Sequence, residues 1–385
     1  MGVLAGVRIV EVGGIGPGPF CGMLLADLGA EVILVERPVE GHGATDLGAA
    51  AIFHRGKRSI VLDLKADRGL QTALRLIESA DGLIEGMRPG VMERLGFGPD
   101  VCLERNPRLV YGRMTGWGQS GPLARAAGHD NNYIALSGAL WYAGNAGEPP
   151  VAPPTLLGDL GGGALYLAVG MLAGILSARA TGRGTVVDAA IVDGSAHLMN
   201  LMLAFKATGQ FSMERGKSLL DGPHWYATYR CSDGKFITVG SLEPQFYSLL
   251  VGKLGLDGDP AFADGYDPGR WPDQKRRFAE LFATRTRAQW CEVLEGTDAC
   301  FAPVLTPEEA ARHPHNQARG IYSERDGILQ AAPAPRFSGA AAVPGPIPAR
   351  GEHTDEILRA AGFPAAEVER LRADGIVAQG LAERT

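Results

Sequence analysis

The sequence lacks the signals of a secreted, disulfide-stabilised or membrane protein. Its cysteines are few, scattered and odd in number, and no two have metal-ligand or redox spacing: Cys21, Cys102, Cys231, Cys291 and Cys300. This pattern indicates reduced thiols and a cytoplasmic protein. The first residues show no basic segment followed by an apolar run, so no secretory signal is expected. The longest apolar helical candidate, residues 163–179, is short and interrupted by glycines, so no membrane span is expected.

A basic excess is also absent. The formal net charge is -6 and the sequence pI is about 5.8, whereas a surface that binds a nucleic-acid backbone needs an excess of lysine and arginine. The composition therefore argues against nucleic acid as the main partner. A local basic patch can still hold a small anionic ligand.

The nucleotide and metal motifs that could explain the glycine-rich start are incomplete. The turn GGIGPGPF, residues 13–20, does not match G-x-G-x-x-G, and its two prolines remove backbone donors that would hold a pyrophosphate. It predicts a tight turn with proline at a helix start. His313 and His315 have no companion ligands, and neither a P-loop nor a zinc motif is present. We therefore expect no metal and no redox cofactor.

Strand and helix patterns alternate through the first half of the chain, which predicts an α/β fold with an open, mostly parallel sheet and helices on both faces. The predicted strands are residues 7–12, 31–38, 58–65, 80–86, 107–118 and 185–191. A hairpin around a Ser-Asp-Gly turn at 232–234, followed by helical patterns and one more strand at 300–306, predicts a smaller α+β domain.

The length exceeds what one hydrophobic core usually serves. We predict a large domain over residues 1–190, a linker with an apolar helix over 191–224 and a small α+β domain over 225–306. A return linker over 307–332 and a C-terminal segment over 333–385 that packs back on the large domain complete the chain. The apolar helix at 192–209 has no strand to return to.

Four polar residues in a row, 129–132, precede an apolar run. One interpretation is that Asp130 or Asn131 caps a helix and that His129 merely precedes it. The other is that His129 is a base directed at a ligand. The sequence alone leaves both open.

A second unusual stretch, LLGDLGGGALYL, places Asp159 before three glycines that open a helix. Each glycine costs roughly 1 kcal/mol in a helix relative to alanine, so the stretch indicates a close backbone approach. Bare amides at a helix start can hold an oxyanion. A histidine and an aspartate that face each other across a cleft can remove a proton next to a carbonyl group and return it to the other face.

A basic group lies near the predicted ends of the second and third strands and beyond the fourth. It comprises Arg37, Arg55, Lys57, Arg58, Lys65, Arg88 and Arg94. It is either a solvated face or a site for a polyphosphate ligand, because arginine forks match phosphate oxygens.

At these residues the chain resembles the family III CoA-transferases over nearly its whole length. The resemblance is carried by GIGPGP, DLGAEV, RSIVLDLK, EGMRPGVMERLGFGP, YGRMTGWGQSGP, AGHDNNYIALSGAL, GDLGGG, GRGTVVDAAIVDGS and SDGKFITVGSLEPQFY. It implies a Rossmann-like large domain, a small domain and two long linkers, with two chains interlocked as a homodimer. The implied substrate is an acyl-CoA thioester, so CoA belongs to the substrate and no cofactor is needed.

The resemblance also implies roles for single residues. His129 and Asp159 would be the acid/base pair of an isomerase that interconverts (2R)- and (2S)-2-methylacyl-CoA through an enolate. The residues expected to line the site are Asp130, Tyr133, Gly161, Gly162 and, from the small domain, Glu243, which could reach the other subunit's His129. Amides near the glycine turn would hold the thioester oxygen. CoA would contact Arg37, Arg55, Lys65 and Arg94, and its adenine would lie near Leu62.

Two alternatives remain at this stage. The transferases of the family use an aspartate at the position of Asp159 as a nucleophile that forms an acyl anhydride. They often carry a glycine-rich loop where this chain has VGSLEPQF, and no histidine is expected in them at the position of His129, so both differences favour the isomerase. The second alternative is a non-catalytic acyl-CoA-binding protein. The methionine-rich run 199–205 is either a pliable surface for apolar tails or core packing.

Overall fold

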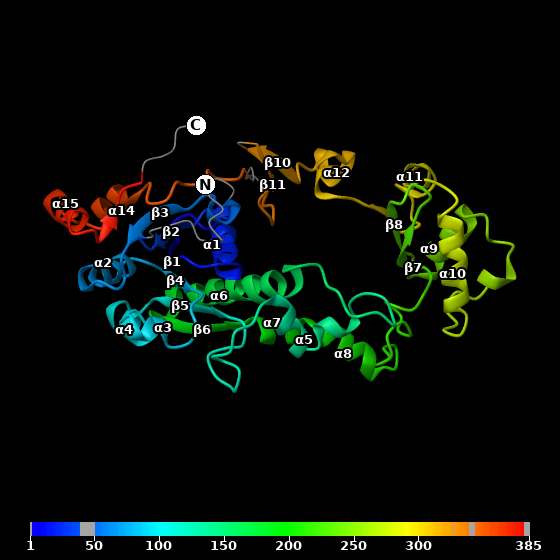
Figure 1. Ribbon diagram of the computed structural model, residues 1–385, viewed down its shortest axis with the longest axis horizontal. Coiled ribbons are helices and arrows are strands. Elements are labelled where there is room, and N and C mark those ends of the chain that lie inside the picture. The colour runs from blue at the N-terminus through cyan, green and yellow to red at the C-terminus, as the bar shows by residue number, and fades with distance from the viewer. Residues whose placement is uncertain (1, 39–50, 326, 339–342, 381–385) are drawn as a thin grey trace. The chain divides into compact units, whose positions relative to one another are not determined.

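The computed structural model describes the chain except residues 1, 39–50, 326, 339–342 and 381–385. The last two ranges belong to the predicted C-terminal segment and lie outside the described residues. The chain divides into two compact units (Figure 1). The first comprises residues 1–140, 152–198 and 322–385, and the second comprises residues 141–151 and 199–321. The first unit thus reaches residue 198, and a short excursion at 141–151 joins the second unit.

The first unit is built on a seven-stranded sheet in the order β12-β3-β2-β1-β4-β5-β6. All neighbouring strands are parallel except the short β12, which runs antiparallel to β3. The strands are β1 Arg8–Val12, β2 Glu31–Glu36, β3 Arg58–Leu62, β4 Gly82–Glu85, β5 Val110–Thr115, β6 Thr185–Ala190 and β12 Val377–Ala378. The predicted α/β class with a mostly parallel sheet is confirmed.

Helices cover both faces of this sheet, which explains why its central strands are continuously buried. One face packs against α1 (Pro17–Asp27) and α6 (Leu165–Thr181). The other face packs against α2 (Asp67–Ile77), α4 (Pro99–Arg105), α14 (Thr354–Ala360) and α15 (Ala365–Ala373). The sequence pattern missed α4 and β12, which are short, and it missed the hairpin of β10 (Tyr322–Arg325) and β11 (Ile328–Ala331).

The strand order reverses between β1 and β4. From β1 the chain builds outward to β2 and β3, and it then returns to add β4, β5 and β6 on the other side. In open parallel sheets, ligands bind beyond the carboxyl ends of the strands at such a reversal. The segments 13–16 and 86–90, which follow β1 and β4, therefore flank the expected ligand crevice.

The helix that carries Asp159 is longer than the apolar candidate 163–179. A π-helical stretch, η4 (Leu156–Ala164), runs into α6 and gives 26 continuous residues that are long and apolar enough, by length and composition alone, to cross a membrane. The expectation that no apolar helix reaches this length is wrong. However, α6 packs against β5 and β6, and a single such helix is weak evidence for a membrane span.

The single apolar helix expected at 192–209 is two helices. In the first unit, α7 (Ile191–Leu198) ends the chain segment that follows β6. In the second unit, α8 (Asn200–Ala207) has no buried residue in the structure. The pattern could not reveal the break at Met199 because apolar residues continue through it.

The second unit is α+β. Its sheet has the order β7-β8-β9, from Tyr226–Arg230, Phe236–Gly240 and Phe301–Val304, and both pairs are antiparallel. The predicted hairpin around residues 232–234 is therefore confirmed. The helices are α9 Pro244–Lys253, α10 Trp271–Phe282, α11 Arg287–Leu294, α12 Pro307–Arg312 and α13 Pro314–Ala318. The core between sheet and helices is rich in aromatic side chains.

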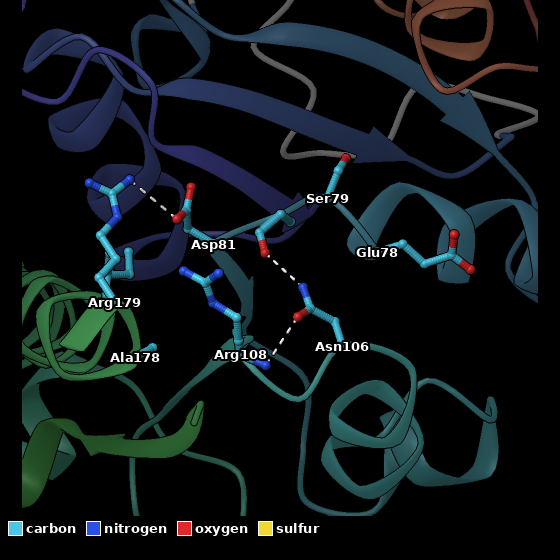
Figure 2. A pocket seen from close by; sticks show the side chains of 9 residues that line it. Glu78, Ser79, Asp81, Asn106, Arg108, Ala178 and Arg179 are labelled. Carbon is cyan, nitrogen blue, oxygen red and sulfur yellow. Dashed lines mark hydrogen bonds and ion pairs between the residues drawn. The ribbon is translucent and has the colours of Figure 1, made fainter. Parts of the chain in front are cut away.

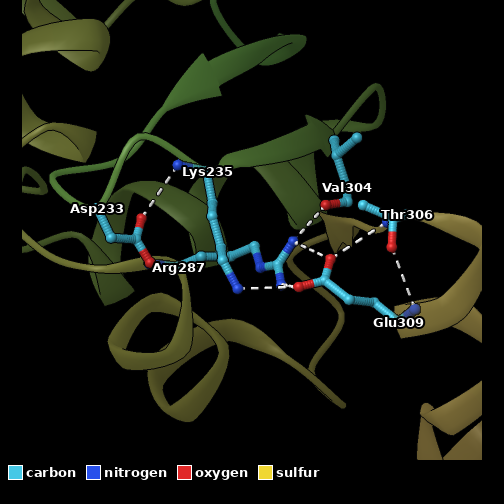
Figure 3. A network of polar contacts seen from close by, with 6 residues as sticks. All are labelled: Asp233, Lys235, Arg287, Val304, Thr306 and Glu309. Carbon is cyan, nitrogen blue, oxygen red and sulfur yellow. Dashed lines mark hydrogen bonds and ion pairs between the residues drawn. The ribbon is translucent and has the colours of Figure 1, made fainter.

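An ion-pair network joins α12 to this sheet (Figure 3). Arg287 donates to both carboxylate oxygens of Glu309 over 2.7 and 2.9 Å, and Lys235 Nζ donates to Glu309 Oε1 over 2.9 Å. Hydrogen bonds from these two cations hold the pKa of Glu309 well below its usual range. The network therefore holds α12, the first helix after β9, on the second unit.

His224 makes the stability of the second unit sensitive to acid. Its side chain is fully buried beside Phe278, with Nε2 3.1 Å from the Tyr247 hydroxyl. Burial, with a smaller contribution from the charge of Lys275, lowers the pKa of His224 to about 3. His224 is therefore protonated in the unfolded chain below about pH 6.5. In the folded chain it stays neutral until the pH approaches its folded-state pKa of about 3.

We expect the free energy of unfolding to fall as the pH is lowered through this window, by about 1.4 kcal/mol per pH unit from His224 alone. His224→Leu should remove that contribution and flatten the pH dependence relative to the parent protein. Urea unfolding between about pH 7 and 4.5, followed by the fluorescence of the buried Trp225 and Trp290, measures the difference. Parallel curves for the two proteins would contradict the prediction.

Candidate active site

His129 is the first residue of the site, at the N-cap of α5 (Asp130–Leu136). Its backbone N–H donates to Asn132 Oδ1 over 3.0 Å, so Asn132 satisfies the start of the helix, and the imidazole is left exposed. The alternative that Asp130 or Asn131 caps this helix is wrong. Asp130 lies inside the helix, and its side chain is buried.

Asp159 lies in η4, the π-helical stretch that begins after Thr155. Thr155 has a left-handed backbone conformation, with φ of 63°. A π-helix is wider than an α-helix, and short π stretches occur frequently at functional sites. The backbone N–H of Asp159 donates to Asp130 Oδ1 over 2.8 Å. This bond ties the start of η4 to the start of α5.

The carboxyl group of Asp159 is tuned by its neighbours. Burial and, to a smaller extent, the negative charge of Asp130 raise its pKa to about 6, while the proximity of His129 acts in the opposite direction. His129 and Asp159 therefore lie close enough to interact electrostatically. The structure brings the two predicted acid/base residues together, which their separation in the sequence could not establish.

Asp130 is a buried member of the site. Its side chain is only 6% exposed, and its second oxygen, Oδ2, is buried without a hydrogen-bond partner among the described residues. A Cβ atom on Gly158 would lie 2.4 Å from Asp130 Oδ1. Glycine at 158 is therefore needed for the carboxylate to reach the backbone of Asp159, a requirement that no local sequence pattern reveals.

Tyr133 supports the segment before His129. Its hydroxyl donates to the carbonyl of Gly128, and its ring makes an edge-on contact with Trp117, with centroids 4.7 Å apart. A Cβ on Gly116 or Gly128 would overlap this ring, at 2.0 and 2.7 Å. Burial and the nearby charge of Asp159 raise the pKa of Tyr133. Tyr133 thus lies beside both halves of the acid/base pair.

The glycines that follow Asp159 serve packing. A Cβ on Gly162 would lie 2.4 Å from Ser195 Oγ of α7, and one on Gly163 would lie 3.0 Å from Ile191. Gly161 and Gly162 occupy the second half of η4, where a π-helix bonds each N–H to the carbonyl five residues earlier. Their amides are used within the helix, which argues against the expectation that they hold a thioester oxygen.

Three of the predicted CoA residues lie at one edge of the sheet. Arg37 follows β2, Lys65 follows β3, and Arg94 ends α3 (Val91–Arg94) beyond β4. All three side chains are exposed. Because the carboxyl ends of parallel strands share one edge, Arg37 and Lys65 lie on the side of the sheet where ligands are expected, although β2 and β3 do not themselves flank the reversal between β1 and β4.

The other two predicted CoA residues have different positions. Arg55 precedes β3, at the opposite edge, and its guanidinium is buried against Asp27 Oδ2 at 2.6 Å and Gln330 Oε1 at 2.9 Å. It links α1 to β11, which argues against a contact with phosphate. The side chain of Leu62 is fully buried in the core, so only its backbone can approach an adenine ring.

Glu243 belongs to the second unit, at the N-cap of α9, and it is exposed. Its charge raises the pKa values of Cys300 and Tyr266 after the larger effect of their burial. It therefore lies near both residues within that unit. Its predicted role toward His129 stays a prediction.

A cavity of about 250 Å³ lies at the other edge of the first sheet, before β4 and β5 (Figure 2). It is lined by Asp81, Asn106, Arg108 and Arg179, among others, and Arg179 pairs with Asp81 over 3.2 Å. None of the predicted site residues lines this cavity. Across the described ranges, no group of three histidine, cysteine, aspartate or glutamate side chains could hold a metal ion.

The comparisons with known proteins agree with this architecture. The profile of CoA-transferase family III matches residues 4–354, so the chain belongs to this family. It is similar to human alpha-methylacyl-CoA racemase, with 44% identity over 97% of each chain. It is also similar to acetyl-CoA:oxalate CoA-transferase of Acetobacter aceti, with 29% identity over 88% of this chain and 90% of the other.

The fold also matches a solved structure, a CAIB/BAIF family protein from Brucella suis. The TM-score is 0.78, with 26% identity over 94% of this chain and 99% of the other. The α/β fold with its mostly parallel sheet is therefore shared with this group of proteins.

Substitution of Asp130 tests the tuning of Asp159. Asp130→Asn keeps an oxygen that can accept the Asp159 N–H but removes a like charge, so we expect the pKa of Asp159 to fall from about 6 toward the ordinary carboxyl range. Burial should keep it above that range. The pKa is measured by NMR titration of ¹³C-labelled aspartate carboxyl groups. Asp193→Asn, on the exposed side of α7, is the control, and an unchanged Asp159 titration in Asp130→Asn would refute the prediction.

Proposed function

We propose that the protein is a racemase, an isomerase that interconverts the (2R) and (2S) epimers of 2-methylacyl-CoA thioesters. The observation that carries this proposal is the electrostatic coupling of an imidazole and a carboxyl group, His129 and Asp159, at the starts of two adjacent helices. The higher identity to the racemase than to the transferase supports it.

In the proposed reaction, one base removes the α-proton and leaves a planar enolate. The other base, in its protonated form, then delivers a proton to the opposite face of the same carbon. His129 removes the proton from one epimer and Asp159 removes it from the other. Each turnover therefore moves one proton off the carbon and one proton onto it, and the bases exchange protonation states.

The raised pKa of Asp159 suits this exchange. At about 6 it is close enough to neutral pH for the carboxyl group both to hold and to release a proton. The two protonation states of the pair differ only in which base holds a single proton. A reaction that runs in both directions with little free-energy difference needs both states.

The enolate oxygen needs hydrogen-bond donors at the same place. Since the amides of Gly161 and Gly162 are used inside η4, we assign this role to the first-turn amides of Leu157 and Gly158, which have no carbonyl five residues earlier within the helix. Asp130 and Tyr133 hold the two halves of the pair in place. Glu243 of the small domain is assigned to the His129 site of the other subunit, as the family resemblance implies.

The CoA part of the substrate is assigned to the carboxyl edge of the large sheet. Arg37, Lys65 and Arg94 supply exposed positive charge there, and the backbone at Leu62 is assigned to the adenine. Proton transfer at a thioester needs no redox group, so the proposed reaction uses no cofactor. The free thiols of all five cysteines fit a cytoplasmic location.

Half-reactions in heavy water test the two-base mechanism. His129→Gln and Asp159→Asn should each lose racemisation by roughly 10²- to 10⁴-fold, because each lacks one of the two bases. Each variant should still exchange the α-proton of one epimer for deuterium with retention, and the two variants should do so with opposite epimers. Chiral chromatography and mass spectrometry of the recovered acyl group read configuration and label.

The matched control for these variants is His315→Gln, an exposed histidine of α13 in the second unit, which should racemise like the parent. If the substrate contains no deuterium after incubation with the parent protein, the protein does not exchange the α-proton. That outcome would refute the racemase and support a non-catalytic acyl-CoA-binding protein. An acyl anhydride on Asp159 that hydroxylamine cleaves to a hydroxamate, with CoA transfer only to an added acid, would identify a CoA-transferase instead.

We also propose that two chains form an interlocked homodimer. In the first unit, one face of α6 exposes large apolar side chains: Leu165 at 46%, Val169 at 66% and Leu176 at 71%. In the second unit, α8 exposes Leu201 at 57% and Leu203 at 53%. Apolar faces of this extent are uncommon on monomers and typically mark a protein–protein contact.

Substitution on α6 tests the dimer. Val169→Glu places a charge in the centre of the apolar face, so we expect the dimer to dissociate or its dimerisation constant to weaken by about 100-fold or more. Val101→Glu, on the exposed surface of α4, is the control and should leave the assembly unchanged. Sedimentation velocity over a range of concentrations measures the mass. A monomeric parent protein would refute the dimer.

A further inference from the structure

Three charged side chains form a network at the carboxyl ends of β4 and β5. Glu85 and Arg113 are partners in the strand register, and Arg113 Nε donates to Glu85 Oε1 over 3.1 Å. Arg113 Nη1 donates to Glu93 Oε1 of α3 over 2.7 Å. Glu85 is fully buried and Arg113 is 6% exposed, whereas the Glu93 side chain is 44% exposed. We call these residues the Arg113 network.

The Arg113 network fixes both ends of segment 86–90. At the first end, the backbone N–H of Met87 donates to Glu85 Oε2 over 2.6 Å. At the second end, Gly90, with φ of 84°, begins α3, and α3 is held to the network through Glu93. One buried guanidinium thus connects the entry and the exit of the segment.

Segment 86–90 lies at the reversal of strand order, next to the acid/base pair. It follows β4, one of the two strands that flank the expected ligand crevice. The positive charge of Arg88 acts on Tyr133, which also senses the charge of Asp159. Arg88 and Arg94 are exposed on the segment and on the helix that follows it. The network therefore anchors the segment and the helix that carry these two cations.

Core packing alone does not account for this arrangement. Apolar side chains of similar volume usually stabilise an interior as well as a buried ion pair or better, because they avoid the cost of desolvating two charges. What an apolar replacement could not supply is the hydrogen bonds to Met87 and to Glu93, which fix the segment and α3.

We propose that the Arg113 network is a positioning device for substrate binding, which holds segment 86–90 and α3 so that their arginines meet the anionic part of an acyl-CoA thioester. This inference rests on the proposed function and adds Glu85, Glu93 and Arg113 to it as positioning residues. They act through the segment and the helix they hold, so their loss weakens binding and leaves the proton transfer itself intact.

Two variants test the network from its two ends. Glu85→Gln keeps an acceptor for the Met87 N–H but weakens the link to Arg113, and Glu93→Gln weakens the link to α3. Burial raises the pKa of Glu85 to about 7, so a neutral side chain costs little there and Glu85→Gln should fold. Glu93 is half-exposed, so Glu93→Gln should fold even if Glu85→Gln does not.

The measurements are the dissociation constant of CoA by isothermal titration calorimetry and the steady-state constants for one epimer of 2-methyloctanoyl-CoA. We expect Kd and KM to rise by about 10-fold in each variant while kcat changes by less than about 2-fold. Glu78→Gln is the matched control, because Glu78 is a similarly exposed partner of Arg105 at the opposite edge of the sheet. It should leave Kd, KM and kcat unchanged.

The split between KM and kcat separates positioning from a purely structural role. A lower melting temperature with unchanged Kd and KM in both variants would overturn the inference, as would a loss confined to kcat. If the parent racemises and binds CoA and the variants do so equally, only this inference fails. If the parent neither binds CoA nor exchanges the α-proton, the proposed function fails, and the inference fails with it.

Discussion

The hydrogen bond between the Asp130 carboxylate and the backbone N–H of Asp159 is the constraint on which the site depends. It joins two helix starts that are 29 residues apart in the chain, and one of them carries His129. A buried carboxylate is costly to desolvate, and here its charge also raises the pKa of the neighbouring Asp159 carboxyl. The same contact therefore sets both the position of Asp159 and its affinity for a proton.

That contact is possible only because backbones approach each other closely around η4. Gly158 leaves room for the Asp130 carboxylate, and Gly162 lets η4 cross α7 at Ser195. A Cβ at Gly158 would lie 2.4 Å from Asp130 Oδ1 and one at Gly162 would lie 2.4 Å from Ser195 Oγ, so a side chain at either position would force its neighbour to shift. The glycines that weaken this stretch as a helix are thus what permits its packing, and the π-helical turn accommodates Asp159 within it.

Arginines at the two edges of the large sheet have different roles, although their sequence contexts look alike. Arg55 is buried at the amino edge and links α1 to β11 through Asp27 and Gln330. Arg94 is exposed at the carboxyl edge, on a helix that Arg113 anchors through Glu93. The direction of the parallel strands decides which edge faces a ligand, so the same residue type is a structural link at one edge and an exposed cation at the other.

The sequence by itself determined the alternation of strands and helices, the parallel sheet, the hairpin near residue 233 and the place of His129 just before a helix. It also put Asp159 before a helix, whereas Asp159 lies inside η4. These features follow from local patterns of apolar residues, glycines and turn residues, which short segments encode. Only the tertiary structure decided that Asp130 turns inward, that the amides of Gly161 and Gly162 are used within a helix, and that Arg55 and the side chain of Leu62 are buried. Each of these depends on contacts between segments far apart in the chain, and no local pattern specifies which partner a side chain will meet.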